Sequence, residues 1–152
     1  MAIAERDNQI AKIKEQKIRM QINETQYGEK YIEIQKRYRD RILKVINEDN
    51  AKKKRITAQT RLKAVEEIEK TNKKIYDYEV KALDASRKLM ESEISEKQKL
   101  IQNNEYIMEV ERINQQQKVF DELLERTSLY YATKIKLAQE NAQGTLNIEK
   151  LS

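Results

Sequence analysis

Histidine, cysteine, proline and tryptophan are absent from the 152 residues of this chain, and glycine occurs only twice. Histidine and cysteine are the side chains that most often bind zinc, haem or iron–sulfur clusters and that serve as catalytic bases or nucleophiles. Proline and glycine are the residues that most often end a helix. Their scarcity therefore predicts a protein that is helical almost throughout, that is not an enzyme, and that binds no metal and no cofactor.

Charged residues make up 38% of the chain and hydrophobic residues also 38%, a smaller apolar share than most globular domains have. A thin apolar stripe on long helices fits this composition better than a thick core does. Such a stripe would be buried against other helices of this chain or of partner chains. We therefore predict an all-α fold of long helices, in three segments or nearly continuous, in a helical bundle or a coiled-coil-like assembly.

Positive charge is concentrated in the first half of the chain, whose overall net charge is +5. Residues 1–76 carry 20 Lys/Arg against 12 Asp/Glu, whereas residues 77–152 carry 11 against 14. The densest basic run is Lys52, Lys53, Lys54 and Arg55. One interpretation of this run is contact with nucleic acid without sequence preference, through the phosphates. The other interpretation is a solvated, charged helix surface.

Apolar side chains recur at helical spacing in two stretches of the chain. Many pairs are eleven residues apart, such as Tyr27 with Tyr38 and Phe120 with Tyr131. An eleven-residue repeat corresponds to about 3.67 residues per turn, which favours nearly straight or slightly right-handed packing. We predict that ten residues of these stripes form helix-packing or interface contacts: Tyr27, Tyr31, Ile34, Tyr38, Ile42, Val45, Phe120, Leu124, Tyr131 and Ile135.

Two polar stretches, near residues 47–55 and 102–105, interrupt the apolar pattern. Asparagine and aspartate in them compete with the helix for backbone hydrogen bonds, so both are predicted breaks. The predicted helices are then 3–46, 52–101 and 105–143. Oppositely charged pairs such as Glu48 with Lys52 and Asp49 with Lys53 support the other reading, a nearly continuous rod.

The end of the apolar repeat predicts where the last helix ends and where the domain begins and ends. Gly144 follows the last clear repeat, where a glycine cap is common, so residues 144–152 are predicted to be a C-terminal tail. The whole of 1–152 would form a single elongated helical domain. No stretch approaches the roughly 18 apolar residues of a membrane span, and Met1–Lys14 contains no apolar run typical of a signal peptide. The sequence thus predicts a soluble chain made in the cytoplasm.

In composition, the whole chain resembles the small all-helical internal or tail-associated proteins of tailed bacteriophages, which include scaffold, core and cargo proteins. The resemblance rests on the helical tracts Ile13–Tyr38 and Phe120–Ala142, on abundant Lys, Asn, Ile and Glu, and on the lack of His, Cys and Pro. It implies a structural virion protein, made in the host cytoplasm and packed in many copies inside the capsid, portal or tail. Its implied partners are copies of itself and other virion proteins. The alternative function is a cytoplasmic coiled-coil adaptor or a non-specific nucleic-acid-associated protein.

Overall fold

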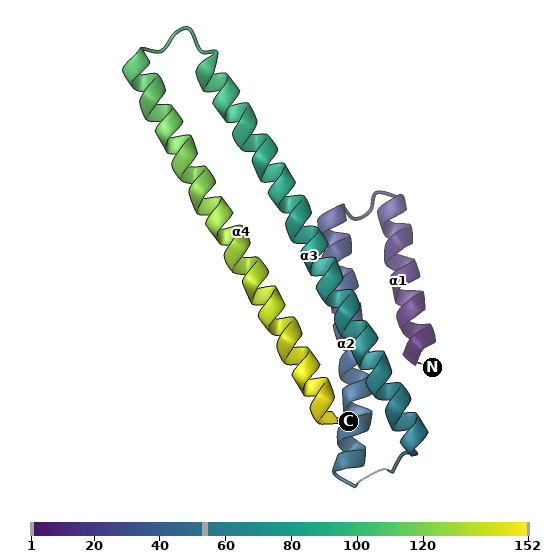
Figure 1. The fold of residues 1–152 in the computed structure, drawn as a ribbon. Coiled ribbons are helices and arrows are strands. Elements are labelled where there is room, and N and C mark those ends of the chain that lie inside the picture. Colours follow the sequence, from purple (N-terminus) through teal and green to yellow (C-terminus); the bar gives the residue numbers. More distant parts are fainter. Residues whose placement is uncertain (1, 53–54, 152) are drawn as a thin grey trace. The chain divides into compact units, whose positions relative to one another are not determined.

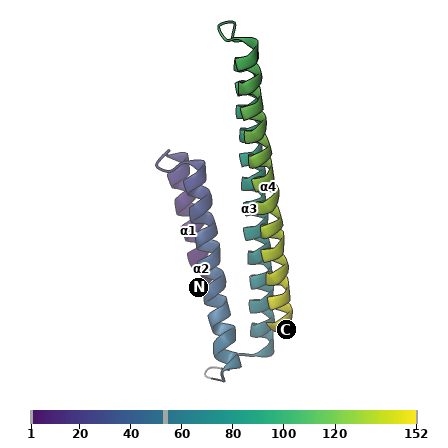
Figure 2. The same ribbon diagram turned by 90° about the vertical axis from the view of Figure 1, so that its left-hand side faces the viewer.

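The computed structural model describes residues 2–52 and 55–151, and four helices account for most of them. The helices are α1 (Ala2–Ile18), α2 (Glu24–Asn50), α3 (Ala58–Gln102) and α4 (Glu109–Leu151), as labelled in Figure 1 and seen again in Figure 2. Within these described ranges there is no strand. The predicted all-α class is therefore confirmed, but the described residues form four helices where the sequence predicted three.

The helices belong to two compact units. Unit 1 comprises Met1–Glu79 and Ala138–Ser152, and so contains α1, α2, the beginning of α3 and the end of α4. Unit 2 comprises Val80–Leu137, and so contains the rest of α3 and α4 with the turn that joins them. The sequence predicted one elongated domain, whereas the contacts gather in these two units.

A helix break that the sequence analysis missed separates α1 from α2. Met20 adopts a left-handed backbone conformation, with φ of 59°, just beyond the end of α1. Asn23 then caps α2, because its side chain accepts a hydrogen bond from the backbone N–H of Gln26 at 2.8 Å. The side chain of Gln26 in turn accepts from the backbone N–H of Asn23 at 3.0 Å. This capping box satisfies donors that a helix start leaves unpaired, so the predicted helix 3–46 is two helices.

The connection between α2 and α3 is held by the buried side chain of Asp49. Its carboxylate accepts hydrogen bonds from the backbone N–H of Ile56 at 3.2 Å and from the guanidinium of Arg61 at 2.8 Å. Thr57 caps α3 by accepting from the backbone N–H of Thr60 at 3.1 Å. Lys52, at φ of 59°, has left the helical conformation. These contacts turn the chain between the end of α2 at Asn50 and the start of α3 at Ala58, which overlaps the predicted break at 47–55. The two helices therefore do not form the continuous rod of the alternative prediction.

The connection between α3 and α4 is capped by one side chain. The guanidinium of Arg112 donates to the backbone oxygens of Ile101 at 2.5 Å, Gln102 at 2.7 Å and Asn104 at 2.8 Å. The last carbonyl groups of a helix have no partner within it, so Arg112 supplies the donors that the end of α3 lacks. This turn lies at the predicted break near residues 102–105.

The core of unit 1 consists of two apolar clusters. The first is formed by Ile13, Tyr27 and Ile34 with Ile10, Ile22, Tyr31 and Tyr78 packed against it. The second is formed by Ile46, Val65 and Ile68 with Ile42, Leu43, Ala64 and Ile148 packed against it. Both clusters combine residues from different helices, so burial of apolar area holds α1, α2 and the adjoining parts of α3 and α4 together.

Unit 1 also contains polar side chains that are buried or partly buried: Arg6, Gln35, Tyr38, Glu67 and Thr71. The hydroxyl of Tyr38 donates to Glu67 at 2.9 Å, and the guanidinium of Arg6 lies 4.4 Å from the centre of the Tyr38 ring. Burial and this hydrogen bond raise the pKa of Tyr38 to about 12. The side-chain oxygens of Gln35 and Thr71 are buried without a hydrogen-bond partner among the described residues.

Unit 2 is an antiparallel helix pair with a single apolar cluster. Met90 and Ile94 of α3 and Val119 of α4 are buried, with Ile101 and Leu123 packed against them. Two ion pairs cross between the helices: Lys97 with Glu122 at 3.0 Å, and Arg126 with Glu93 at 3.1 Å. The buried Tyr130 donates its hydroxyl to Asp84 at 2.5 Å. The partners run in opposite order along the two helices, which fixes the antiparallel register.

Gly144 does not end α4, which continues to Leu151 where the sequence predicted a tail. A glycine inside a helix costs only about 1 kcal/mol relative to alanine. Ile148, four residues further on, packs against the cluster of Ile46, Val65 and Ile68. The burial of Ile148 offsets the glycine penalty and holds the last turns of the helix in place.

Candidate functional site: an uncharged apolar face on helix α4

Helix α4 carries an apolar face that no other part of unit 2 covers. This α4 face consists of five large side chains, each 49–58% exposed: Ile113, Phe120, Leu124, Tyr131 and Ile135. Their spacing alternates between seven and four residues, so the positions repeat every eleven. At 3.6 residues per turn they fall within a sector of about 60° on the helix surface. Four of the five belong to the predicted interface set.

The side of α4 that faces α3 is a different stripe. Val119, Leu123 and Tyr130 are the residues of α4 that pack toward α3 in unit 2. Val119 and Tyr130 are also eleven residues apart, and each directly precedes a member of the α4 face. Helix α4 therefore has two apolar stripes about 100° apart, of which only one is buried within the chain.

Charged side chains are missing from the α4 face. Between Ile113 and Ile135 the one other position within this 60° sector is Gln117, which is uncharged, although 38% of the whole chain is charged. Beyond the edges of the sector lie Gln116, Thr127 and Lys134 on one side and Ser128 on the other. Glu122 and Arg126 lie on other sides of α4 and pair with α3, and the hydrogen bond from Lys97 lowers the pKa of Glu122. Depletion of charge and enrichment in aromatic side chains are the features that mark the centre of protein–protein interfaces.

A shallow groove between the two helices of unit 2 adjoins this face. It is lined by Ser95, Gln98, Lys99 and Gln102 of α3 and by Ile113, Gln116, Gln117 and Phe120 of α4. Most of these side chains are amides or hydroxyls, which can both donate and accept hydrogen bonds. The groove therefore extends the α4 face with polar groups that a partner side chain could contact.

The structure places the predicted N-terminal stripe mainly inside unit 1. Tyr27, Ile34 and Tyr38 are buried, and Tyr31 and Ile42 are half-buried. The ring of Tyr31 lies 4.7 Å from that of Tyr78, measured between centroids. Val45 is 39% exposed, and the following residue, Ile46, is fully buried in its place. This stripe thus serves mainly the internal core, in contrast to the one on α4.

Only part of the predicted basic run can be located. Lys52 lies just after α2 and Arg55 just before α3, and both are exposed. Lys53 and Lys54 lie outside the described residues. Contact of this run with nucleic acid therefore stays a prediction from the sequence.

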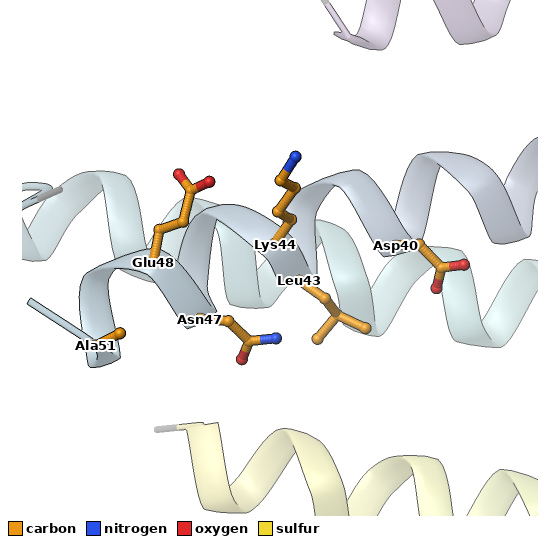
Figure 3. A pocket seen from close by; sticks show the side chains of 6 residues that line it. All are labelled: Asp40, Leu43, Lys44, Asn47, Glu48 and Ala51. Carbon is orange, nitrogen blue, oxygen red and sulfur yellow. The ribbon is translucent and has the colours of Figure 1, made fainter. Parts of the chain in front are cut away.

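A further hollow lies on α2 in unit 1 and is shown in Figure 3. Five of its lining residues come from this helix, Asp40, Leu43, Lys44, Asn47 and Glu48, and the sixth, Ala51, directly follows it. The carboxylates of Asp40 and Glu48 belong to positions about 12 Å apart along the helix axis, too far apart to act on one bound atom. Among the described residues, moreover, no group of three or more acidic side chains is placed to hold a metal ion.

Ile113, Gln116, Gln117, Thr127 and Ser128 are members of the candidate surface that the sequence analysis did not select. Two signals could have identified them. Ile113 precedes Leu124 by eleven residues, and the run from 113 to 117 contains no charge. The spacing and the missing charge indicate an exposed face only once it is known which side of α4 is buried against α3.

Comparison with known proteins identifies no relative: no protein family, curated protein or solved structure matches the chain. Within the described residues, no helix combines the length and the apolar character needed to cross a membrane. The functional argument therefore rests on the α4 face and its surroundings.

Proposed function

We propose that this chain is a non-enzymatic structural or assembly protein that binds other helical protein chains through the α4 face. Its proposed setting is a tailed-bacteriophage virion, packed in many copies inside the capsid, portal or tail. The observation that carries the assembly role is the uncovered, charge-free apolar stripe on a helix whose other apolar stripe is already buried.

The apolar area of the α4 face is large enough to drive association. A fully buried aromatic side chain removes about 150–250 Å² from water, so each half-exposed member of the face offers roughly 100 Å². Five such residues offer roughly 500 Å², or about 12 kcal/mol at 25 cal/mol per Å². Association costs about 4–15 kcal/mol in lost motion. A partner that matches the face in shape and buries comparable area of its own therefore gains net affinity.

The virion setting is supported by composition. Abundant Lys, Asn, Ile and Glu, with no His, Cys or Pro, is the pattern in which the chain resembles internal phage proteins. A helical protein that offers an apolar stripe to its neighbours also suits packing in many copies inside a shell.

Quantitative mass spectrometry of purified particles tests this function. Particles from cells that produce this chain would be banded in a density gradient, treated with nuclease and washed at high salt. We expect the chain to remain with the particles in several copies or more, counted against the major shell protein. Recovery of the chain only outside the particles would contradict the proposal.

A further inference from the structure

We infer that the α4 face pairs with the α4 face of a second copy of this chain, antiparallel, about a two-fold axis that passes near Thr127 and Ser128. This inference rests on the proposed function, because it names the partner of the same surface. Three observations carry it: the order of the apolar residues, the distribution of charge, and the area available for burial.

The order of the apolar residues reads the same in both directions. Phe120, Leu124, Tyr131 and Ile135 are separated by four, seven and four residues. In an antiparallel pair centred between Thr127 and Ser128, Phe120 lies opposite Ile135 of the second copy, and Leu124 lies opposite Tyr131. Each aromatic ring then meets an aliphatic side chain. The small side chains at the centre allow the two helix axes to approach to about 8–10 Å.

Charge on the adjoining side of α3 favours the same arrangement. Lys88 precedes Ser95 by seven residues and Glu91 precedes Gln98 by seven, so both lie on the side of α3 that lines the groove next to Phe120. Both are exposed, and Glu91 accepts a hydrogen bond from Arg87 at 2.9 Å.

The contacts of Arg126 with Glu93 and of Tyr130 with Asp84 lie on either side of the centre of the α4 face, and so place the stretch between Lys88 and Glu91 level with that centre. An antiparallel pair then sets Lys88 of each copy opposite Glu91 of the other. Unit 2 as a whole carries ten Lys/Arg and ten Asp/Glu, so two copies of it do not repel.

The area is sufficient for a specific but modest interface. Two α4 faces together offer roughly 1,000 Å², which lies at the lower limit for specific association. The paired groove surfaces on α3 add to this area. A reversible dimer, formed at micromolar rather than nanomolar concentration, is the expected result.

Sedimentation equilibrium of the full chain at about 100 μM, well above such a dissociation constant, tests the pairing. We expect the wild-type chain to be dimeric and Leu124→Glu to associate at least tenfold more weakly. Leu129→Glu is the matched control, because Leu129 is on the same helix and 66% exposed but outside the face. It should remain dimeric, and circular dichroism should show equal helix content in all three proteins. A monomeric wild-type chain, or equal association of the two variants, would overturn the inference.

A charge reversal tests the antiparallel orientation in the same experiment. Lys88→Glu places a like charge opposite Glu91 and should weaken association about three- to tenfold. Adding Glu91→Lys to it restores opposite charges and should restore wild-type association. Unchanged association of Lys88→Glu, or no recovery in the double variant, would overturn the antiparallel arrangement.

The failure of this inference and that of the proposed function give different results. A chain that is monomeric in solution but remains with purified particles contradicts the self-pairing and leaves the structural function intact. A chain that forms the expected dimer but is missing from particles contradicts the virion setting and leaves the self-pairing intact.

Discussion

Replacing Thr71 with valine should make unit 1 more stable. Thr71 is fully buried in α3, and its hydroxyl oxygen has no hydrogen-bond partner among the described residues. A buried hydroxyl without a partner has lost its bonds to water and gained nothing in return. Valine keeps the branched shape at Cβ and has a similar helix propensity, so the exchange changes little except the polar atom.

The magnitude follows from the cost of an unsatisfied polar group. Leaving a buried donor or acceptor unpaired costs about 1–3 kcal/mol. The added methyl group also occupies the space of the hydroxyl in an apolar surrounding, near Ile68 and Ile75 on the same helix. We expect Thr71→Val to raise the free energy of unfolding by about 1–2 kcal/mol, the lower part of that range, because some strain in the repacked site offsets the gain.

Urea unfolding followed by circular dichroism measures this change. Thr145→Val is the matched control, since Thr145 is also in unit 1 and helical, but is exposed and donates its hydroxyl to the backbone oxygen of Asn141 at 3.1 Å. The control should change the free energy of unfolding by less than about 0.5 kcal/mol. If Thr71→Val were neutral or destabilising, the hydroxyl would have a partner in solution and the reasoning about this unpaired buried hydroxyl would be refuted.

Three further predictions concern single contacts. Gly144→Ala should stabilise the chain by about 0.5–1 kcal/mol, because alanine has the higher helix propensity. Gly28→Ala should stabilise it less, because the new Cβ would lie 3.0 Å from the ring of Tyr78. Thermal unfolding of both variants compares the two effects directly. Arg112→Lys should destabilise unit 2 by about 1–2 kcal/mol, because one ammonium group cannot reach the carbonyl groups of Ile101, Gln102 and Asn104 together. Faster amide hydrogen exchange at the end of α3 would reveal this loss. The raised pKa of Tyr38, about 12 against the usual 10.0, means that its contribution to stability is complete below pH 10 and is lost as the pH rises toward 12. Tyr38→Phe should therefore remove that part of the alkaline loss in a pH series of urea titrations, and an unchanged alkaline loss would count against the buried hydrogen bond.

Much of the fold is predictable from local sequence. The helical spacing and the absence of proline predict helices nearly throughout, and the polar runs near Asn50 and Asn103 predict two of the three breaks. The break at residues 19–23 contains neither proline nor glycine, and its signal is the pair Asn23 and Gln26 at capping-box spacing. A capping box is easily missed inside a charged, helix-forming sequence, because its residue types also occur in helix interiors.

Local sequence does not predict whether an apolar stripe is buried within the chain or left exposed. Tyr38 and Tyr131 occupy equivalent positions in eleven-residue repeats, yet one is 4% exposed and the other 49%. Spacing determines which side of a helix is apolar, but not what covers that side. The buried polar side chains cannot be predicted either, since nothing in the local sequence indicates that Gln35 and Thr71 lie in the interior.

The central claim, that the α4 face is where this chain joins an assembly, is tested most directly by incorporation of two variants into particles. Leu124→Glu and Leu129→Glu add the same charge to the same helix, on the face and off it. Mass spectrometry of purified particles should find Leu129→Glu at the wild-type copy number and Leu124→Glu reduced at least tenfold. Equal copy numbers of the two variants would contradict the claim.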